Sequence, residues 1–448
     1  MNRTIHTKIF LLILLFSCPV FVFSQEYPII QEVCDISYVP SSFPVGFALC
    51  THGNQQFVAY YDSAKNMTVA SRKTDNCIWD YQILDNKIGW DSHNYVVLKI
   101  DSEGYIHVVG NLHASPLIYY RSLKPLDIHS LTRIPKMVGT EEDRMTYPVF
   151  MNGPDGAFIF HYRHGGSGNG YEIYNVWDAK KQVWERYLNE PLIDGKGKRN
   201  AYMDGPVPGP DNYYHMIWVW RETPDCATNH TLSYARSKDL SNWENIAGEK
   251  VTLPITIEES SLYVDDTPPG GGLFNPGIKL GFDPSGKVLI GYHKYDQHLN
   301  TQLFIARYEN GKWLKKQVTN WDFHWVFQGN GSVFSQLSVD RPKSLPNGQV
   351  AFGYHRVDAG SGEILLDGRT MDPVGSRPYT RRYPDELDMI TSDYPEMSVR
   401  KTFDSGRSSN NKEFYLLRWE TLPANRDARR NGTLPHPSIL KIYKLAKD

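Results

Sequence analysis

The sequence predicts an all-β protein, a seven-bladed β-propeller, from three observations. Apolar strand patterns recur along the whole chain, helix patterns are almost absent, and a turn rich in Gly, Asp, Asn or Pro divides each pair of strands. The strands group into seven units of about 50 to 70 residues, the size of a propeller blade. Separate β-sandwich domains are the alternative. No Pro/Ser-rich linker divides the units, which favours a single domain over residues 25–448.

The first unit shows the pattern that the later units repeat. We expect an apolar strand over residues 45–51, a tight turn at Gly53-Asn54 and a second strand over residues 57–61. His52 closes the first strand and Asp62 closes the second. Because paired strands run antiparallel, these two side chains are expected on opposite faces of the ring.

Six further hairpins are expected after the first. They span residues 93–113, 146–163, 201–221, 277–294, 335–356 and 396–445. The two longest irregular stretches, 260–276 and 367–386, are expected to be loops over one face. The segment around Ile36 and Tyr38 is expected to add a strand to the last unit and so close the ring. Residues 237–243 resemble the Asp-box of sialidase-type propellers, which is a structural turn rather than a site.

Residues 1–24 are expected to be a secretory signal peptide. Arg3 and Lys8 precede an apolar run over residues 9–23, and a fair cleavage site precedes Gln25. No later run is long enough to span a bilayer. The protein is therefore expected to be secreted or periplasmic and monomeric, and a lipid anchor at Cys18 is the weaker alternative. The net charge of -2 gives no indication of nucleic-acid binding.

Four cysteines remain after the signal peptide, and they lie far apart. They are Cys34, Cys50, Cys77 and Cys226. Export permits disulfides, but buried free thiols are the simpler interpretation, and the spacing predicts no zinc site. The acidic pairs at 258–259 and 265–266 lack the spacing of a calcium loop. We therefore expect neither a metal nor a cofactor.

Polar residues at the strand ends predict a charged face, here called the anterior face. The second strands end in Asp62, His113, Arg163, Arg221, Lys294, Arg356 and Arg418, and first-strand starts add His93 and Tyr202. This ring of cations and imidazoles is expected to bind an anionic ligand, such as the uronate of a polysaccharide. Arg163, Tyr202 and Arg221 are the expected substrate-binding residues.

Each face carries a candidate catalytic group. His52 lies on the opposite, posterior face and can act as base or acid near neutral pH. On the anterior face, His93, His113 and Tyr162 offer the acid and base that β-elimination at a uronate needs, and Arg163 offers a cation for the carboxylate. No carboxylate pair of the glycosidase type stands at the strand ends, which argues against a two-carboxylate hydrolase.

Several stretches together resemble the BNR-repeat propeller family of carbohydrate-active enzymes, over residues 44–295 and more weakly to the end. They read PVGFALCTHGNQQFVAYYD, DSHNYVVLKIDSEGYIHVVGNLH, TYPVF, YRHGGSGNG, RNAY and WVWRETPD. The resemblance implies a seven-bladed propeller. It also implies one of two activities, each with its own site.

One branch holds ulvan and related uronate lyases, of polysaccharide lyase families 24, 25 and 42. The resemblance implies a His pair with the spacing of His93 and His113, and a tyrosine matching Tyr162. Where those lyases commonly carry Asn-Arg, this chain has Asn175-Val176.

The other branch is glycoside hydrolase family 145, with a site similar to the position of His52. Because this chain keeps His52 and lacks the lyase arginine, we interpret it as an exo-acting α-L-rhamnosidase. It would remove L-rhamnose from D-glucuronic acid in plant glycans such as arabinogalactan, with His52 as the catalytic residue. A uronate lyase at His113, His93 and Tyr162 is the first alternative. A non-catalytic glycan-binding propeller is the second.

Overall fold

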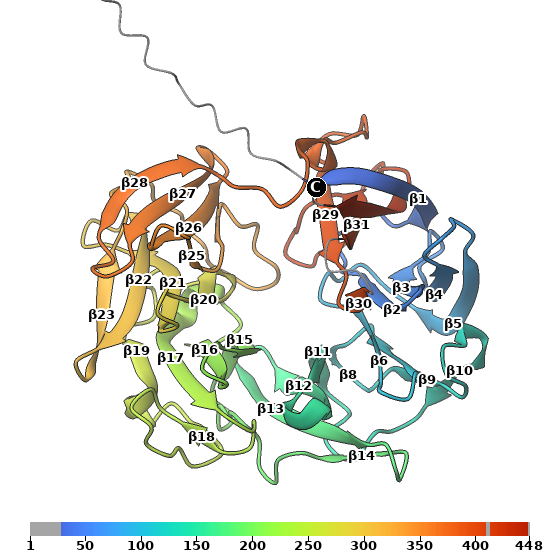
Figure 1. Cartoon of the computed structure of the whole chain (residues 1–448), viewed down its shortest axis with the longest axis horizontal. Helices are drawn as coiled ribbons and strands as arrows, with labels where there is room; N and C mark the ends of the chain where they lie inside the picture. The colour runs from blue at the N-terminus through green and yellow to red at the C-terminus, as the bar shows by residue number, and fades with distance from the viewer. Residues whose placement is uncertain (1–27, 409–412, 447–448) are drawn as a thin grey trace, which may run out of the picture.

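The computed structural model describes residues 28–408 and 413–446, so the expected signal peptide lies outside the described residues. The described residues form seven sheets of four or five strands, which lie around a central opening (Figure 1). Helix in these residues is limited to 3-10 segments of three or four residues. The all-β prediction is confirmed. Within the described ranges, no helix has the length and apolar character that a membrane span needs.

Sheets I to VII are numbered here in chain order of their first hairpins, with strands in hydrogen-bonded order. Sheet I holds β30 (Arg407–Ser408), β2 (Ala48–Gly53), β3 (Gln55–Tyr61), β4 (Asn66–Lys73) and β5 (Asp80–Lys87). Sheet II holds β10 (Leu131–Ile134), β9 (Tyr119–Ser122), β7 (Ile106–Gly110) and β6 (Val96–Ile100). Sheet III holds β14 (Val183–Arg186), β13 (Asn169–Asp178), β12 (Phe158–Gly166), β11 (Met145–Asn152) and β8 (His113–Ser115).

The remaining four sheets follow the same plan. Sheet IV holds β15 (Asn200–Pro208), β16 (Tyr214–Arg221), β17 (Asn229–Ser237) and β18 (Trp243–Glu244), with β19 (Tyr263–Asp265) on β17. Sheet V holds β20 (Ile278–Phe282), β21 (Val288–Tyr295), β22 (Thr301–Glu309) and β23 (Lys312–Gln317). Sheet VI holds β24 (Leu337–Val339), β26 (Gln349–Arg356), β27 (Gly360–Asp367) and β28 (Pro373–Pro378), with β25 (Lys343–Ser344) on β26. Sheet VII holds β1 (Ile29–Val39), β32 (Ser438–Ala446), β31 (Glu413–Thr421) and β29 (Ser398–Phe403).

Two stretches expected to be irregular each contain a strand. Residues 260–276 include β19, and residues 367–386 include β28, the outer strand of sheet VI. The β28 sequence, PVGSRP, begins and ends with proline and contains a glycine. These residues are uncommon in strands, so the sequence does not predict one here. An outer strand tolerates these residues because one of its edges has no partner to hydrogen-bond.

The two ends of the described chain meet in sheet VII. The expected N-terminal closing strand is confirmed, because β1 pairs antiparallel with β32. A disulfide joins Cys34 on β1 to Cys77, which follows β4 of sheet I. The prediction of free thiols at these two positions was wrong, whereas Cys50 and Cys226 are buried free thiols. The pairing was not visible in the sequence because the two cysteines become neighbours only when the ring closes.

Removing this disulfide should weaken the ring closure. We expect the Cys34→Ser and Cys77→Ser double variant to lose about 2–4 kcal/mol of unfolding free energy, because the bridge closes a long loop in the unfolded chain. Urea unfolding of the oxidised protein, the reduced protein and the double variant measures this. Equal midpoints for all three would contradict the expectation.

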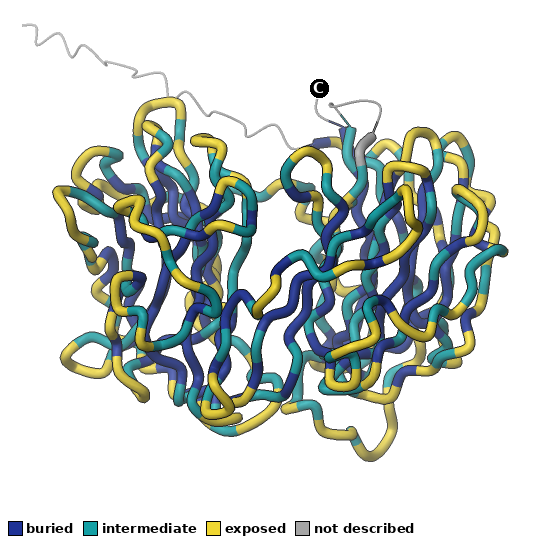
Figure 2. Tube along the Cα trace, turned by 90° about the horizontal axis from the view of Figure 1, so that it is seen from below, coloured by how far each residue is buried: buried dark blue, intermediate teal, exposed yellow. Residues whose placement is uncertain are grey.

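The apolar core is divided among the interfaces between neighbouring sheets. Figure 2 shows the buried residues along the strands and the exposed residues at the loops of both ends. The interface between sheets VII and I is typical, with the rings of Phe47 and Trp419 at a centroid distance of 4.6 Å. Burial of such side chains supplies the main favourable free energy of the fold. Because apolar side chains fill these interfaces, polar groups that can contact a ligand are expected at the strand ends of the two faces.

The Asp-box segment forms a turn, as expected. The carboxylate of Asp239 accepts hydrogen bonds from the backbone N–H groups of Ser241 and Asn242, at 2.9 and 2.7 Å. The buried Trp243 donates its indole N–H to the carbonyl of Leu240 at 3.0 Å. These contacts fix the connection from β17 to β18 and expose no reactive group.

Candidate active site

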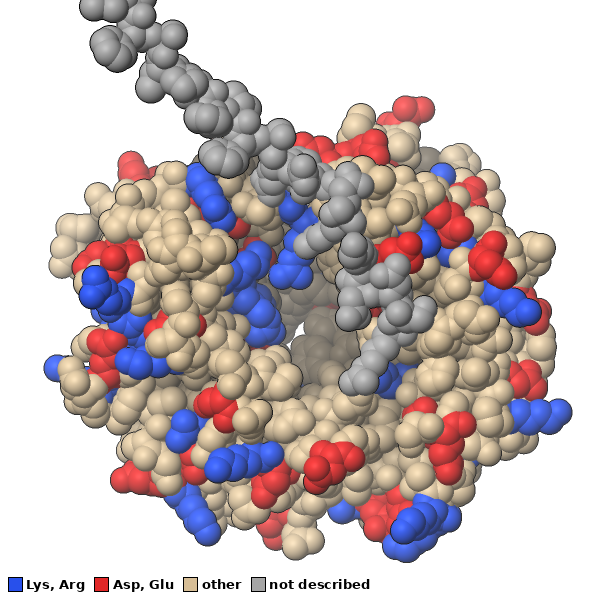
Figure 3. Space-filling view, viewed as in Figure 1, with Lys and Arg blue, Asp and Glu red and all other residues tan. Residues whose placement is uncertain are grey.

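The central opening has two mouths, and the strand register separates the candidate histidines. Val96 pairs with Gly110 and Ile100 with Ile106 in the hairpin of β6 and β7. His93 and His113 therefore flank the same end of this hairpin, about 16 Å from its turn. In the space-filling view, Lys and Arg side chains gather at one side of the opening (Figure 3).

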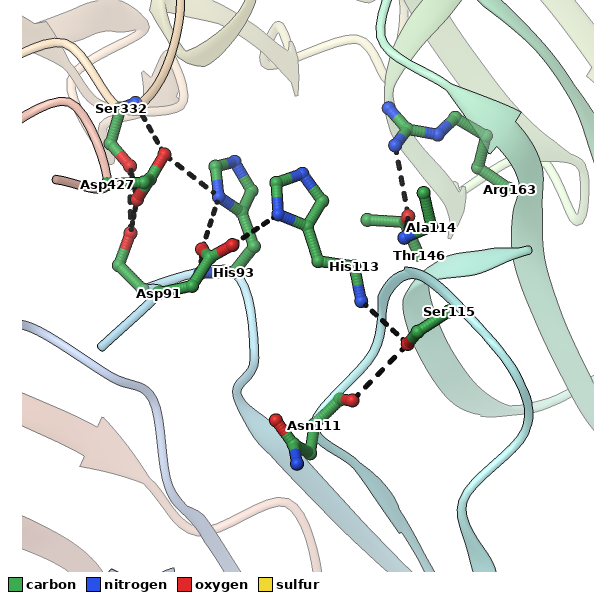
Figure 4. A network of polar contacts seen from close by, with 11 residues as sticks. Asp91, His93, Asn111, His113, Ala114, Ser115, Thr146, Arg163, Ser332 and Asp427 are labelled. Carbon is green, nitrogen blue, oxygen red and sulfur yellow. Dashed lines mark hydrogen bonds and ion pairs between the residues drawn. The ribbon is translucent and has the colours of Figure 1, made fainter. Parts of the chain in front are cut away.

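His93 and His113 form a stacked pair at the anterior face. Their ring centroids are 4.2 Å apart and their planes differ by 20°. Asp91 lies against both rings, because one carboxylate oxygen contacts Nδ1 of His93 at 3.0 Å and the other contacts Nδ1 of His113 (Figure 4). Each ring thus has its Nδ1 turned to a carboxylate. A neutral imidazole that donates from Nδ1 keeps its Nε2 lone pair available as a base.

A second carboxylate reaches the pair from the far end of the chain. Asp427 Oδ2 lies 3.2 Å from Nδ1 of His93. Its oxygens also accept from the hydroxyl of Ser92 at 2.7 Å and from the backbone N–H of Ser332 at 2.8 Å. Three chain segments that are distant in sequence therefore meet at His93, and the sequence offered no signal for this contact.

The two carboxylates hold His93 in its charged form. Burial lowers the pKa of an imidazole, but the hydrogen bonds and charges of Asp427 and Asp91 outweigh it here and raise the pKa of His93 from 6.5 to about 9. Burial opposes ionisation of Asp427 as well, yet its bonds from His93, Ser332 and Ser92 keep its pKa well below the usual range. At neutral pH the site therefore contains a positive imidazole beside His113.

Tyr147 is the tyrosine that the structure brings to this pair. Its ring centroid is 5.9 Å from that of His93. It sits in a bulge of β11, where the pairing with β12 jumps from Thr146 to Val149, and its φ is 58°, in the left-handed region. A bulky residue seldom adopts this conformation, and bulges re-aim side chains beside active sites. Burial raises the pKa of Tyr147 to about 12, so its hydroxyl is a proton donor at neutral pH.

Arg163 supplies unpaired donors close to Tyr147. The side chain is buried, its guanidinium carbon lies 4.8 Å from the Tyr147 ring centroid, and Nη2 donates to Thr146 Oγ1 at 3.0 Å. Its Nε and Nη1 have no hydrogen-bond partner within the described residues. A buried guanidinium with open donors is suited to a carboxylate ligand, which it binds through two hydrogen bonds.

Arg221 and Tyr202 extend this group of residues onto sheet IV. The Arg221 guanidinium lies 4.1 Å from the Tyr202 ring centroid and donates from Nε to Asn229 Oδ1 at 2.8 Å. The Tyr202 hydroxyl is 2.7 Å from Ser167 Oγ. The ring of Tyr202 is 6.2 Å from that of Tyr147. Through Tyr147, neighbouring ring and guanidinium contacts therefore connect the expected binding residues Arg163, Tyr202 and Arg221 to the His pair.

The structure does not bring Tyr162 to this group. Its side chain is buried, and its hydroxyl donates to the carbonyl of Glu141 at 3.0 Å and accepts from Arg186 at 3.2 Å. Alternate residues of a strand point to opposite sides, so Tyr162 and Arg163 cannot both face the channel. Tyr162 was expected here because it adjoins the strand-end residue Arg163 and matches the tyrosine of the resembling lyases, whereas the bulge that brings Tyr147 to the His pair has no sequence signal.

The expected ring of cations is mostly neutralised. Lys294 is paired with Asp265 at 2.7 Å, Arg356 with Asp358 at 2.6 Å and Arg418 with Glu420 at 2.9 Å. Asp62 accepts from the backbone N–H and the side chain of Asn66. These partners sit on adjacent loops and strands, where a list of strand-end residues does not show them. Arg163 and Arg221 remain as the ring members beside the His pair.

His52 lies at the posterior mouth. It is exposed, and it lines a pocket of about 640 Å³ together with Lys99, Asp101 and Asn152. Within the described ranges its ring makes no side-chain hydrogen bond, whereas both anterior histidines are held by carboxylates.

Two groups of side chains have the spacing of metal ligands in the part of the chain that is described. One is Asp91, His93 and His113, whose ligand atoms all lie within 4.8 Å of one another. The other includes Cys34 and Cys77, which are joined to each other. In the first group the carboxylate of Asp91 contacts Nδ1 of both histidines. The Nε2 atoms of His93 and His113 are therefore the ring nitrogens left for a further ligand.

Glu172 is a buried carboxyl group directly across the strand pair from Arg163. Burial raises its pKa to about 7, although the charge of Arg163 acts in the opposite direction. Because its pKa in the folded state exceeds the unfolded value, its contribution to stability is present below about pH 4.5 and is lost as the pH rises through 7. We expect Glu172→Gln to raise the unfolding free energy by about 3 kcal/mol at pH 8.5 and to change it little at pH 5. Thermal melts at the two pH values measure this, and equal shifts would contradict it.

Comparison with known proteins places the chain in a family. Residues 55–321, more than half of the chain, match the model of BNR repeat-containing family members. The chain belongs to the BNR repeat-containing family. Its match to the ulvan lyase short isoform of Alteromonas sp. (strain LOR) is 30% identical over 168 residues and covers 33% of this chain and 31% of that protein. A match to the ulvan lyase long isoform of Pseudoalteromonas sp. (strain PLSV) is 26% identical and covers 28% of this chain and 14% of that protein.

Solved structures share the fold of this BNR repeat-containing protein over most of its length. Polysaccharide lyase Uly1 superposes with a TM-score of 0.60 at 13% identity, covering 95% of this chain and 99% of that one. A PL25 ulvan lyase gives 0.58 at 14% identity, covering 92% and 96%. At such identities the likeness shows the fold alone, and the curated matches span less than a third of those relatives.

These comparisons overturn the rhamnosidase prediction. The relatives and structures described above are polysaccharide lyases, in agreement with the lyase alternative. The geometry agrees with this, because carboxylates contact both anterior histidines, whereas the His52 ring makes no side-chain hydrogen bond within the described ranges. Val176 in place of an arginine does not exclude a lyase site, because Arg163 on the neighbouring strand has open guanidinium donors.

Proposed function

We propose that this protein is a polysaccharide lyase that cleaves a uronate-containing polysaccharide by β-elimination at the anterior face. The observation that carries the proposal is the stacked His93–His113 pair, held by Asp91 and Asp427 beside the open donors of Arg163. The proposal is supported by the ulvan lyase relatives and by the fold shared with a PL25 ulvan lyase bound to -[GlcA(1-4)Rha3S]-. We propose the same substrate class, glucuronate linked to rhamnose.

In the proposed reaction the site neutralises the uronate carboxylate and then moves two protons. Arg163 and the charged His93 bind the carboxylate, which makes the proton on the adjacent ring carbon more acidic. Nε2 of His113 removes that proton from C5. The C4–O4 bond breaks as the C4=C5 double bond forms, and Tyr147 donates its hydroxyl proton to the leaving oxygen. The products are an unsaturated uronate and a free hydroxyl on the departing sugar.

We further propose that the seven sheets are the blades of one seven-bladed propeller domain that acts outside the cytoplasm as a monomer. The hydrophobic clusters that join neighbouring sheets support a single domain. The Cys34–Cys77 disulfide supports an oxidising compartment.

The proposal is tested by incubating the purified protein with ulvan. We expect the ultraviolet absorbance of an unsaturated uronate to rise with time and no free rhamnose to appear. A protein that binds ulvan in a gel-retention assay without this absorbance would be a glycan-binding protein, and the lyase proposal would fail.

A further inference from the structure

An exposed tryptophan, Trp90, lies close to the His pair and has no part in the reaction described above. Trp90 directly precedes Asp91, and 46% of its surface is exposed. All 11 tryptophans lie in the described part of the chain, and Trp90 alone among them is exposed. An exposed indole beside a catalytic group offers a flat apolar surface, on which the C–H face of a sugar ring can stack.

The loop that carries Asp427 also brings an arginine to Trp90. The guanidinium carbon of Arg429 lies 5.8 Å from the Trp90 ring centroid, and Arg429 is exposed. Among the described residues Arg429 has no carboxylate within ion-pair distance, whereas the neighbouring Arg426 donates to the carbonyl of Asn330 at 3.3 Å. An exposed guanidinium group without a carboxylate partner attracts anionic ligands.

The backbone of this loop is held in an uncommon conformation. Arg426 and Asp427 both have φ in the left-handed region, at 67° and 54°. Consecutive non-glycine residues of this kind are costly and persist where the surroundings fix them. Here Asp427 is fixed by His93, Ser92 and Ser332. The Asp427 side chain is turned inward to the His pair, and Arg429, two residues further along the same loop, is exposed next to Trp90.

From these contacts we propose that Trp90 and Arg429 form a subsite for an anionic sugar residue next to the bond that is cleaved. The indole stacks on the ring of that sugar, and the Arg429 guanidinium binds its sulfate ester or carboxylate. The inference rests on the proposed function, because the sugar belongs to the same polysaccharide. The subsite increases affinity for the polymer and takes no part in proton transfer.

The test measures binding apart from turnover. Affinity electrophoresis through gels that contain ulvan gives the dissociation constant for the wild type, Trp90→Ala, Arg429→Gln and Lys180→Gln. Lys180 is an exposed lysine in the turn between β13 and β14, so its variant loses the same charge on the outer rim. We expect about tenfold weaker binding for Trp90→Ala and Arg429→Gln, no change for Lys180→Gln, and recovery in Trp90→Phe. In turnover assays KM should rise while kcat stays constant.

Each outcome has a defined meaning. Equal binding by the wild type, Trp90→Ala and Arg429→Gln would overturn the subsite, as would equal weakening by Arg429→Gln and Lys180→Gln. Failure of the wild type to bind ulvan would also overturn it. Desulfated ulvan in the gel identifies the anion: weakening limited to native ulvan assigns a sulfate ester, and weakening with both polymers assigns a uronate. If the wild type binds and the variants do not, but no unsaturated uronate forms, the subsite stands and the lyase proposal fails.

Discussion

His113→Ala is expected to lower kcat for elimination by about 10³-fold, the effect of removing a general base. Nδ1 of His113 is turned to Asp91, so Nε2 is the atom left to accept the C5 proton. His93 cannot replace it, because two carboxylates raise the pKa of His93 to about 9 and keep the ring charged. The initial rate of ultraviolet absorbance on ulvan measures the loss, and KM should change little.

His52→Ala is the matched control for this variant. His52 is an exposed histidine at the other mouth, in a pocket that holds none of the proposed reacting groups. We expect its rate to equal that of the wild type, with circular dichroism showing both variants folded. A large loss in His52→Ala together with full activity in His113→Ala would place the reaction at the posterior face and contradict the proposed anterior site.

Asp427→Asn is expected to move the alkaline limit of activity to lower pH. Asp427 is one of the two carboxylates that raise the pKa of His93, so the amide should let that pKa fall toward 6.5. The reaction needs charged His93. The variant should therefore be close to wild type at pH 6 and about tenfold slower at pH 7.5, because one pH unit above a pKa of 6.5 leaves about a tenth of the groups charged. A pH–rate profile from pH 5 to 10 measures the shift.

The same variant should also change how the melting temperature depends on pH. A raised histidine pKa stabilises the fold below the unfolded value of 6.5, and this contribution disappears as the pH rises through 9. The melting temperature of Asp427→Asn should therefore be lower than that of the wild type at pH 6 and should approach it above pH 9. A uniform loss of rate with an unchanged profile would mean that Asp427 only supports the loop.

The sequence predicts the sheets well because their signal is local. A turn such as Gly53-Asn54 between two apolar runs specifies a hairpin without reference to the rest of the chain. Antiparallel pairing then places His93 and His113 together, since both flank one hairpin. The same reasoning separates them from His52, which the structure places at the other mouth.

The parts of the site that the sequence does not predict depend on irregular backbone or on distant contacts. Tyr147 reaches His93 because a bulge breaks the alternation of β11, so regular alternation along this strand does not identify it. Asp427 reaches His93 across more than 300 residues, and Cys34 reaches Cys77 only through ring closure. Strand periodicity contains no information about such contacts.

The most direct test of the central claim is the mass balance of the products. Mass spectrometry of a defined rhamnose–glucuronate tetrasaccharide after digestion shows whether a water molecule has been added. For β-elimination we predict two products whose masses sum to that of the substrate, with the unsaturated uronate as one of them. Products whose masses sum to that of the substrate plus one water would show hydrolysis and would contradict the account.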